Sequence, residues 1–184
     1  MIYREEQMDL FSVSKDYILV HCISADFALG AGIAKTFRDK YNVKNVLKES
    51  WDDYNWNGHG TCLMTNSSVA KDGSGNWMIC NLVTKERYFH KPTYQTLKES
   101  LYSMKFQLME QSLSAPKLAM PLIGCGLDHL EWNQVRTMLQ EIFRDTSAEI
   151  LVCSIEKKKN VILTRNSVKY RNRLLHIIII YLLR

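Results

Sequence analysis

The chain has 184 residues, of which 46% are hydrophobic and 23% are charged, and these values are typical of one globular domain with a sizeable core. Its formal net charge of +5 is unevenly placed, because residues 1–155 hold 16 Lys/Arg and 18 Asp/Glu (balance −2) whereas residues 156–184 hold 8 and 1 (balance +7). This distribution excludes a basic nucleic-acid-binding surface on the folded body.

The five cysteines are odd in number and show no metal-like CxxC spacing. Most of them lie inside apolar runs, which favours reduced core thiols and a protein of the nucleus or cytoplasm. The five histidines are scattered along the chain, so the sequence predicts neither a metal nor another cofactor. The first residues show no signal-peptide pattern.

The first recognisable unit is a strand, a glycine-containing turn and a helix. Residues 17–23 form a continuous apolar run, which is typical of a strand buried on both faces. A turn with two glycines follows at residues 24–34, and helical segments are expected at residues 35–41 and 43–51.

Residues 52–60 are polar and predict a loop, and they are followed by two expected strands at residues 61–65 and 77–83. The segment between these strands, residues 71–76, is typical of a turn. Pro92 and Thr93 then open a helix with one apolar face, made of Leu97, Leu101, Met104 and Leu108.

The second unit begins with a short strand at residues 118–120 and continues through a turn, residues 121–130, that contains Gly124 and Gly126. Apolar residues spaced as on one helix face predict a helix over residues 135–143, and residues 149–155 predict the last strand. Glycines can take backbone angles closed to other residues and let backbone N–H groups approach a ligand. Together with the positive end of a helix dipole, such N–H groups suit a phosphate, although a plain tight turn would have the same sequence.

Asp128 follows this turn, and a carboxylate beside an anion site is unfavourable for binding alone. Its presence therefore indicates a chemical role or, alternatively, a helix cap, because Glu131 follows three positions later.

Strands that alternate with helices predict an α/β layered sheet. Ligands bind such sheets at the carboxyl ends of the strands, so the two glycine turns would face one cleft. Two such turns suit a diphosphate, and the sequence thus predicts a nucleotide-diphosphate pocket.

Three groups of residues carry a resemblance to a known family. They are residues 21–24 with 30–34, residues 82–85 with 90–94, and residues 121–130. In this order they resemble a macrodomain, and within that family the terminal ADP-ribose protein glycohydrolase branch. The resemblance covers about residues 2–155 and implies a three-layer α/β/α fold around a mixed sheet, with ADP-ribose as ligand.

The resemblance also implies which residues bind ADP-ribose, and these are Asp9, Leu10, Ser24, Gly30, Gly32, Ile33, Leu122, Ile123, Gly124, Cys125, Gly126, Leu127 and Ile155. Asp9 would contact adenine, since a carboxylate accepts hydrogen bonds from its amino group, but Met8 stands where the family usually has Gly. From the residues alone, Asp9 and Ser24 are equally turn-forming residues, and Ile155 is equally a core residue.

Lys85 and Asp128 match the catalytic pair of this branch. The resemblance implies that Asp128 acts as general acid/base at the distal ribose, while Lys85 attacks C1″ of the opened ribose to give a lysyl adduct that water resolves. The implied reaction removes ADP-ribose from glutamate or aspartate side chains of proteins, with O-acetyl-ADP-ribose deacetylation as a further activity. Alternatives are an ADP-ribose reader without turnover and an ADP-ribose 1″-phosphate phosphatase, and an exposed lysine at a strand end is also an ordinary solvated edge.

Residues 156–184 lie beyond the resemblance and combine a basic run with about ten apolar residues, too few for the roughly 20 that span a bilayer. They are expected to form a tail outside a domain of residues 1–155. A membrane-surface or nucleic-acid-binding tail is one interpretation, and a terminus that contributes little to the fold is the other. The expected partners of the folded body are ADP-ribose and mono-ADP-ribosylated proteins, which it would bind as a monomer.

Overall fold

The computed structural model describes residues 1–68, 76–113 and 115–155. The expected tail, residues 156–184, and most of the expected turn at residues 71–76 lie outside the described residues. The described elements are, in chain order, β1 (Ile2–Gln7), a short 3₁₀ helix η1 (Leu10–Ser12), β2 (Tyr17–Ser24), α1 (Gly32–Tyr41), α2 (Val43–Ser50), β3 (Thr61–Ser68), β4 (Asn76–Lys85), α3 (Tyr94–Glu110), β5 (Lys117–Met120), α4 (Trp132–Phe143) and β6 (Glu149–Ser154).

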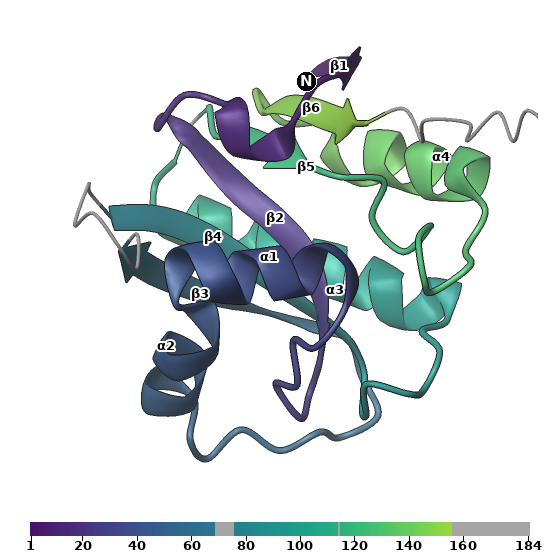
Figure 1. Ribbon diagram of the computed structural model, residues 1–184. Coiled ribbons are helices and arrows are strands. Elements are labelled where there is room, and N and C mark those ends of the chain that lie inside the picture. The colour runs from purple at the N-terminus through teal and green to yellow at the C-terminus, as the bar shows by residue number, and fades with distance from the viewer. Residues whose placement is uncertain (69–75, 114, 156–184) are drawn as a thin grey trace, which may run out of the picture.

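The strands form one mixed sheet with the order β1-β6-β5-β2-β4-β3 (Figure 1). All neighbouring pairs are parallel except β3 and β4, which are antiparallel. The connections through α3 and α4 each return the chain to start a parallel strand, whereas β3, which follows α2, runs antiparallel to β4. The expected mixed sheet is confirmed.

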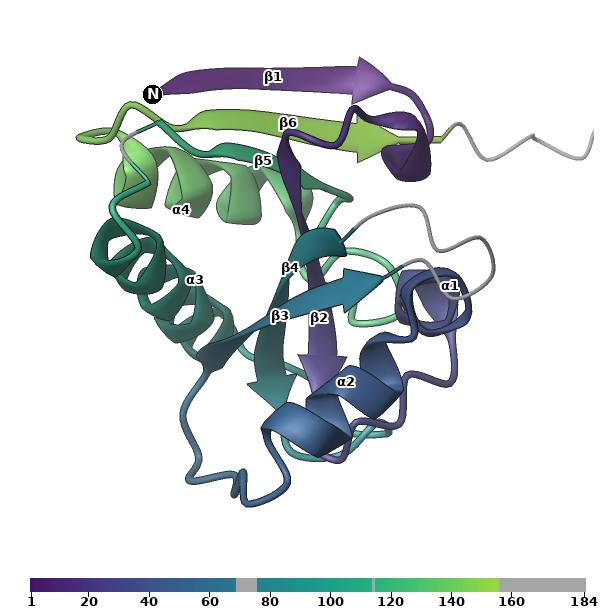
Figure 2. The same cartoon turned by 90° about the vertical axis from the view of Figure 1, so that its left-hand side faces the viewer.

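Helices cover both faces of this sheet, with α1 and α2 on one side and α3 and α4 on the other (Figure 2). Successive residues of the inner strands feed two separate cores, because side chains in a strand alternate between faces. In β2, Ile18 and Val20 pack on the side of α3 and α4, whereas Leu19 and Ile23 pack on the side of α1 and α2. This explains the continuous apolar run in the sequence and confirms the three-layer α/β/α fold.

The helices begin within three residues of where the sequence places them. Thr93 caps α3 by accepting a hydrogen bond from Thr96 N (3.1 Å) and forms a reciprocal capping box with that residue. Helix α4 begins at Trp132, and its N-cap residue Glu131 makes no side-chain cap. The contribution of the α4 dipole to the second glycine turn stays a prediction.

All five cysteines are free thiols, three of them buried (Cys62, Cys80 and Cys153) and two of them partly so (Cys22 and Cys125). In the ranges that the structure describes, no three His, Cys, Asp or Glu side chains are grouped so that they could hold a metal ion. Within the same ranges, no helix is long and apolar enough to cross a membrane.

His21 lies near the centre of β2 and is fully buried. Its ring stacks on Phe37 of α1 with the centroids 3.8 Å apart, and its Nε2 lies 2.8 Å from Asn81 Oδ1 of β4. Burial disfavours the imidazolium and lowers the pKa of His21 to about 4, against an opposing effect of the Asn81 hydrogen bond.

This buried imidazole makes stability depend on pH. Between its folded pKa of about 4 and the ordinary value of 6.5, the unfolded chain binds a proton that the folded protein does not. Acidification through that window therefore destabilises the fold, by about 2 kcal/mol between pH 7.5 and pH 5. We expect urea unfolding to show this loss for the wild type and a much smaller one for His21→Gln. Equal losses in the two proteins would contradict the assignment.

Candidate active site

The predicted site residues meet at one edge of the sheet, because five parallel strands end there. The chain that follows β1 contains Asp9 and η1, and Ile155 follows β6. The glycine turns follow β5 and β2, and Lys85 is the last residue of β4. The register places Ser24 of β2 opposite Lys85, and Ala25 N donates a hydrogen bond to Lys85 O (2.9 Å).

The two glycine turns contact one another. A Cβ atom on Gly32 would lie 3.4 Å from Leu127 Cδ1, which is ordinary van der Waals contact. The carbonyl of Leu127 also accepts a hydrogen bond from Lys91 Nζ at 2.5 Å. The prediction that both turns border one site is therefore consistent with their packing.

The first turn leads directly into a helix, as a phosphate site requires. Helix α1 begins at Gly32, and its N-cap residue Ala31 provides no side-chain hydrogen bond to the first turn. The N–H groups at the start of a helix have no partner within the helix and carry the positive end of its dipole. They are consequently suited to an anion held between the two turns.

In the second turn, the glycines have different roles. Gly124 has φ +71°, in the left-handed region, and a Cβ there would lie 2.8 Å from Leu130 Cδ1. Gly126 does not have a positive φ, so the expectation that it also needs such angles is wrong. No atom lies within 4 Å of a Cβ built on Gly126, and in the described part of the chain its N–H and that of Leu127 meet no acceptor. Gly124 shapes the turn, and Gly126 leaves open space for a ligand.

Lys85 and Asp128 form an ion pair between the end of β4 and the second glycine turn. Lys85 Nζ lies 2.5 Å from Asp128 Oδ1, and their side chains are 13% and 15% exposed. Because β4 lies between β2 and β3, it is not an outer strand of the sheet, and Lys85 is not an ordinary solvent-exposed lysine of an outer strand. Asp128 lies three residues before the N-cap of α4 and contacts Lys85, so the helix-cap alternative is wrong.

Two thiols lie near this pair but are not activated. Burial raises the pKa of Cys22 to about 12, and the negative charge of Asp128 adds to this effect. Burial likewise raises the pKa of Cys125 to about 11, with a contribution from Glu131. Since the thiolate is the nucleophilic form, neither cysteine is suited to act as a nucleophile at neutral pH.

Ser24 takes part in a turn centred on Asp26, a residue that the sequence analysis missed. Ser24 Oγ donates to Asp26 Oδ1 (2.5 Å), which also accepts from Ala28 N (3.3 Å), and Asp26 Oδ2 accepts from Tyr88 N (3.1 Å). Burial raises the pKa of Asp26, but these hydrogen bonds outweigh it and hold the pKa below its ordinary value. In the sequence, the Ser-x-Asp spacing after a strand is the pattern from which this role of Asp26 could have been predicted. The ribose contact of Ser24 stays a prediction.

The structure also shows what surrounds the side chains of four other predicted binding residues. Asp9 Oδ1 caps η1 by accepting from Phe11 N (3.0 Å). The side chains of Leu10 and Ile123 are buried in the two cores, so only their backbone can face a ligand. Ile155 is exposed at the end of β6, which contradicts the alternative of a core residue.

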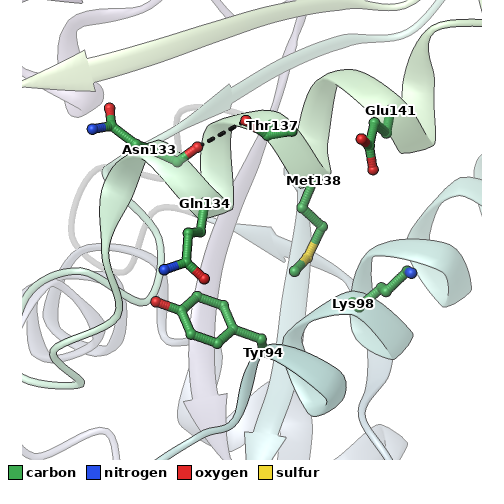
Figure 3. A pocket seen from close by; sticks show the side chains of 7 residues that line it. All are labelled: Tyr94, Lys98, Asn133, Gln134, Thr137, Met138 and Glu141. Carbon is green, nitrogen blue, oxygen red and sulfur yellow. Dashed lines mark hydrogen bonds between the residues drawn. The ribbon is translucent and has the colours of Figure 1, made fainter.

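A separate groove of about 510 Å³ lies between α3 and α4 (Figure 3). None of the predicted site residues lines it. Its lining residues are Tyr94, Lys98, Asn133, Gln134, Thr137, Met138 and Glu141.

Comparison with solved structures identifies the fold. The macrodomain of Mycobacterium tuberculosis DarG superimposes with a TM-score of 0.69 at 17% identity, over 84% of this chain and 99% of that one. Thermosipho africanus DarTG in complex with ADP-ribose gives 0.67 at 16% identity, over 87% of this chain and 43% of that one. The fold and the paired turns at its edge define a macrodomain.

Comparison with curated proteins is more specific. ADP-ribose glycohydrolase OARD1 of Homo sapiens is 37% identical over 148 residues, which are 80% of this chain and 88% of that protein, and the Bos taurus protein gives the same values. No family model matches the chain. The protein belongs to the OARD1 family of ADP-ribose glycohydrolases.

The two glycines of the second turn should respond differently to the same substitution. Gly124→Ala forces a side chain into the left-handed region, which costs about 1–2 kcal/mol, and the melting temperature should fall by about 2–4 °C or more. Gly126→Ala meets open space and should change stability by about 0.5 kcal/mol or less. Thermal unfolding without ligand measures both, and equal losses would contradict the distinction.

Proposed function

We propose that this protein hydrolyses the bond between ADP-ribose and glutamate or aspartate side chains of proteins, with Lys85 as nucleophile and Asp128 as general acid/base. The observation that carries this proposal is the 2.5 Å contact between Lys85 Nζ and Asp128 Oδ1 beside the two glycine turns. The name of the OARD1 relatives, ADP-ribose glycohydrolase, supports it. A module that only reads ADP-ribose has no need of this pair.

The geometry suggests how the two side chains divide the work. Only a neutral amine is nucleophilic, and the Asp128 carboxylate lies where it can accept the proton of Lys85. The amine then bonds to C1″ of the distal ribose, the C1″–O bond to the acceptor breaks, and the acceptor side chain leaves as a carboxylate. The ribose ring of this adduct opens as a C1″=N bond forms and Asp128 returns its proton to the ring oxygen. Water then adds to the imine at C1″ while Asp128 accepts a proton, the C1″–N bond breaks, and the ribose ring closes again. The net reaction consumes one water molecule and regenerates Lys85.

The glycine turns would hold the rest of the substrate. The uncapped N-terminus of α1 and the free N–H groups at Gly126 and Leu127 can bind the two phosphates. Asp9 and Ile155, farther along the same edge, would contact adenine. The linkage preference, the activity on O-acetyl-ADP-ribose, the monomeric state and the location in nucleus or cytoplasm belong to this proposal as expectations from the sequence.

The pocket can be tested by ligand binding alone. ADP-ribose should raise the melting temperature of the wild type, because a ligand that binds only the folded state stabilises it. Gly126→Val should keep its own stability but lose this shift, because a branched side chain would fill the space through which phosphates approach the backbone. Calorimetric titration gives the affinity, and near-native affinity of Gly126→Val would exclude the phosphate site.

The catalytic pair should separate chemistry from binding. Lys85→Ala removes the nucleophile but no phosphate contact, so its affinity for ADP-ribose should stay within about tenfold of the wild type. Its hydrolysis of glutamate-linked mono-ADP-ribosylated protein should fall by more than that factor. Asp128→Ala should bind as well or more tightly, because a negative charge near the diphosphate is removed, while hydrolysis falls about 10²–10⁴-fold.

Two further variants serve as controls. Lys85→Arg keeps the positive charge beside Asp128 but offers no nucleophilic amine, and it should be as inactive as Lys85→Ala. Asp128→Asn keeps the shape of the side chain at position 128 but removes its negative charge. Reductive trapping with substrate should add mass to the peptide that contains Lys85 in the wild type only. Wild-type turnover by Lys85→Ala would refute the assigned nucleophile.

A further inference from the structure

Three consecutive aromatic residues, Tyr88, Phe89 and His90, follow Lys85 by three to five positions. Tyr88 and Phe89, which are 66% and 64% exposed, pack edge to face with their ring centroids 5.2 Å apart. Phe89 packs in the same manner on His90, with centroids 4.7 Å apart. Large aromatic side chains left in water at a site are typical of binding surfaces.

The segment that carries these rings is hydrogen-bonded to both glycine turns, through the backbone of Tyr88 and the side chain of Lys91. Tyr88 N donates to Asp26 Oδ2 (3.1 Å) in the first turn, and Lys91 Nζ donates to Leu127 O (2.5 Å) in the second. His90 N donates a hydrogen bond to Arg87 O (3.0 Å), which closes a turn. The rings are therefore presented in a fixed arrangement, and a ligand that binds them pays little to order the loop.

The sheet order indicates which part of the substrate these rings would meet. The predicted adenine contacts follow β1 and β6, the phosphate turns follow β5 and β2, and Lys85 ends β4. A bound ADP-ribose would thus run along the edge and end with C1″ at Lys85. Tyr88 and Phe89 follow Lys85 by three and four residues, so their Cα atoms lie within about 11 and 14 Å of it. What is attached at C1″ must leave the site close to them.

We propose that Tyr88 and Phe89 form a docking platform for the polypeptide that carries the ADP-ribose, and not for ADP-ribose itself. This inference rests on the proposed function, because it places C1″ at Lys85. It makes the two rings specificity-determining residues for the acceptor protein.

The charges around the rings favour a polypeptide over a nucleic acid. Glu86 lies 3.8 Å from Arg87 and 3.9 Å from His90, and Lys91 donates to a backbone carbonyl. Arg87 and Lys91 thus already have protein partners, and the carboxylate of Asp26 accepts a hydrogen bond from Tyr88 N in the same loop. A phosphodiester chain needs unpaired cations along its path, whereas backbone and apolar side chains of a peptide pack on aromatic rings.

Two substrates with the same ester bond test the platform. One is a mono-ADP-ribosylated protein with the modification on glutamate, and the other is the ADP-ribose ester of a single blocked glutamate. The double variant Tyr88→Ala/Phe89→Ala should lose about tenfold or more in kcat/KM on the protein. It should retain wild-type kcat/KM on the single-residue ester and wild-type affinity for free ADP-ribose.

Matched variants make the result specific. The ring-swapped variant Tyr88→Phe/Phe89→Tyr keeps two rings and should behave as the wild type. Phe106→Ala removes an equally exposed aromatic side chain of α3 and should affect neither substrate. An unchanged rate of the double alanine variant on the protein, or an equal loss on both esters, would overturn the platform.

Two further outcomes separate this inference from the function on which it rests. If the wild type hydrolyses neither ester, the proposed function is wrong. In that case the platform is tested by binding alone. The wild type should bind the ADP-ribosylated protein more tightly than free ADP-ribose, and the double alanine variant should lose this difference in affinity. If that variant instead loses binding of an ADP-ribosylated oligonucleotide and keeps that of the protein, the rings bind nucleic acid and the proposal is overturned.

Discussion

The site depends on one constraint, which is that five neighbouring strands run parallel and end at the same edge of the sheet. Parallel strands require crossovers, and here helices cover both faces of the sheet. Residues that are far apart in sequence, such as Ser24 and Lys85, thereby become opposite partners in the register. The candidate site is consequently formed by the segments that connect the strands to the next elements. The strands and helices determine where those segments begin.

Within that edge, the ion pair of Lys85 and Asp128 meets two opposing demands. Removing a lysine and a carboxylate from water is costly, and a close partner offsets part of this cost. The proposed chemistry, in contrast, needs the amine to give up a proton, and Asp128 Oδ1 lies 2.5 Å from Lys85 Nζ. One carboxylate can meet both demands, as the ion-pair partner of the amine and as its proton acceptor.

Much of this arrangement could be predicted from the sequence, and the reasons differ from residue to residue. The apolar run of β2 and the glycine turns are local patterns, so the fold class and the edge of the site could be predicted. The pairing of Lys85 with Asp128 came only from the resemblance, since nothing local joins residues 43 positions apart. The separate roles of Gly124 and Gly126 depend on where Leu130 packs, and the role of Asp26 depends on a hydrogen bond from Tyr88. Such tertiary contacts leave no periodic signal in a single sequence.

The two protonated thiols near the catalytic pair have a consequence for the behaviour of the protein towards oxidants. Peroxides and electrophiles react with the thiolate, and a pKa of about 12 for Cys22 leaves about one thiol in 10⁵ in that form at pH 7. Sulfenic acid formation at this position is correspondingly slow. A thiol packed against the glycine turns therefore fills space at the site as an apolar side chain would. It does not make the site sensitive to the redox state of its surroundings.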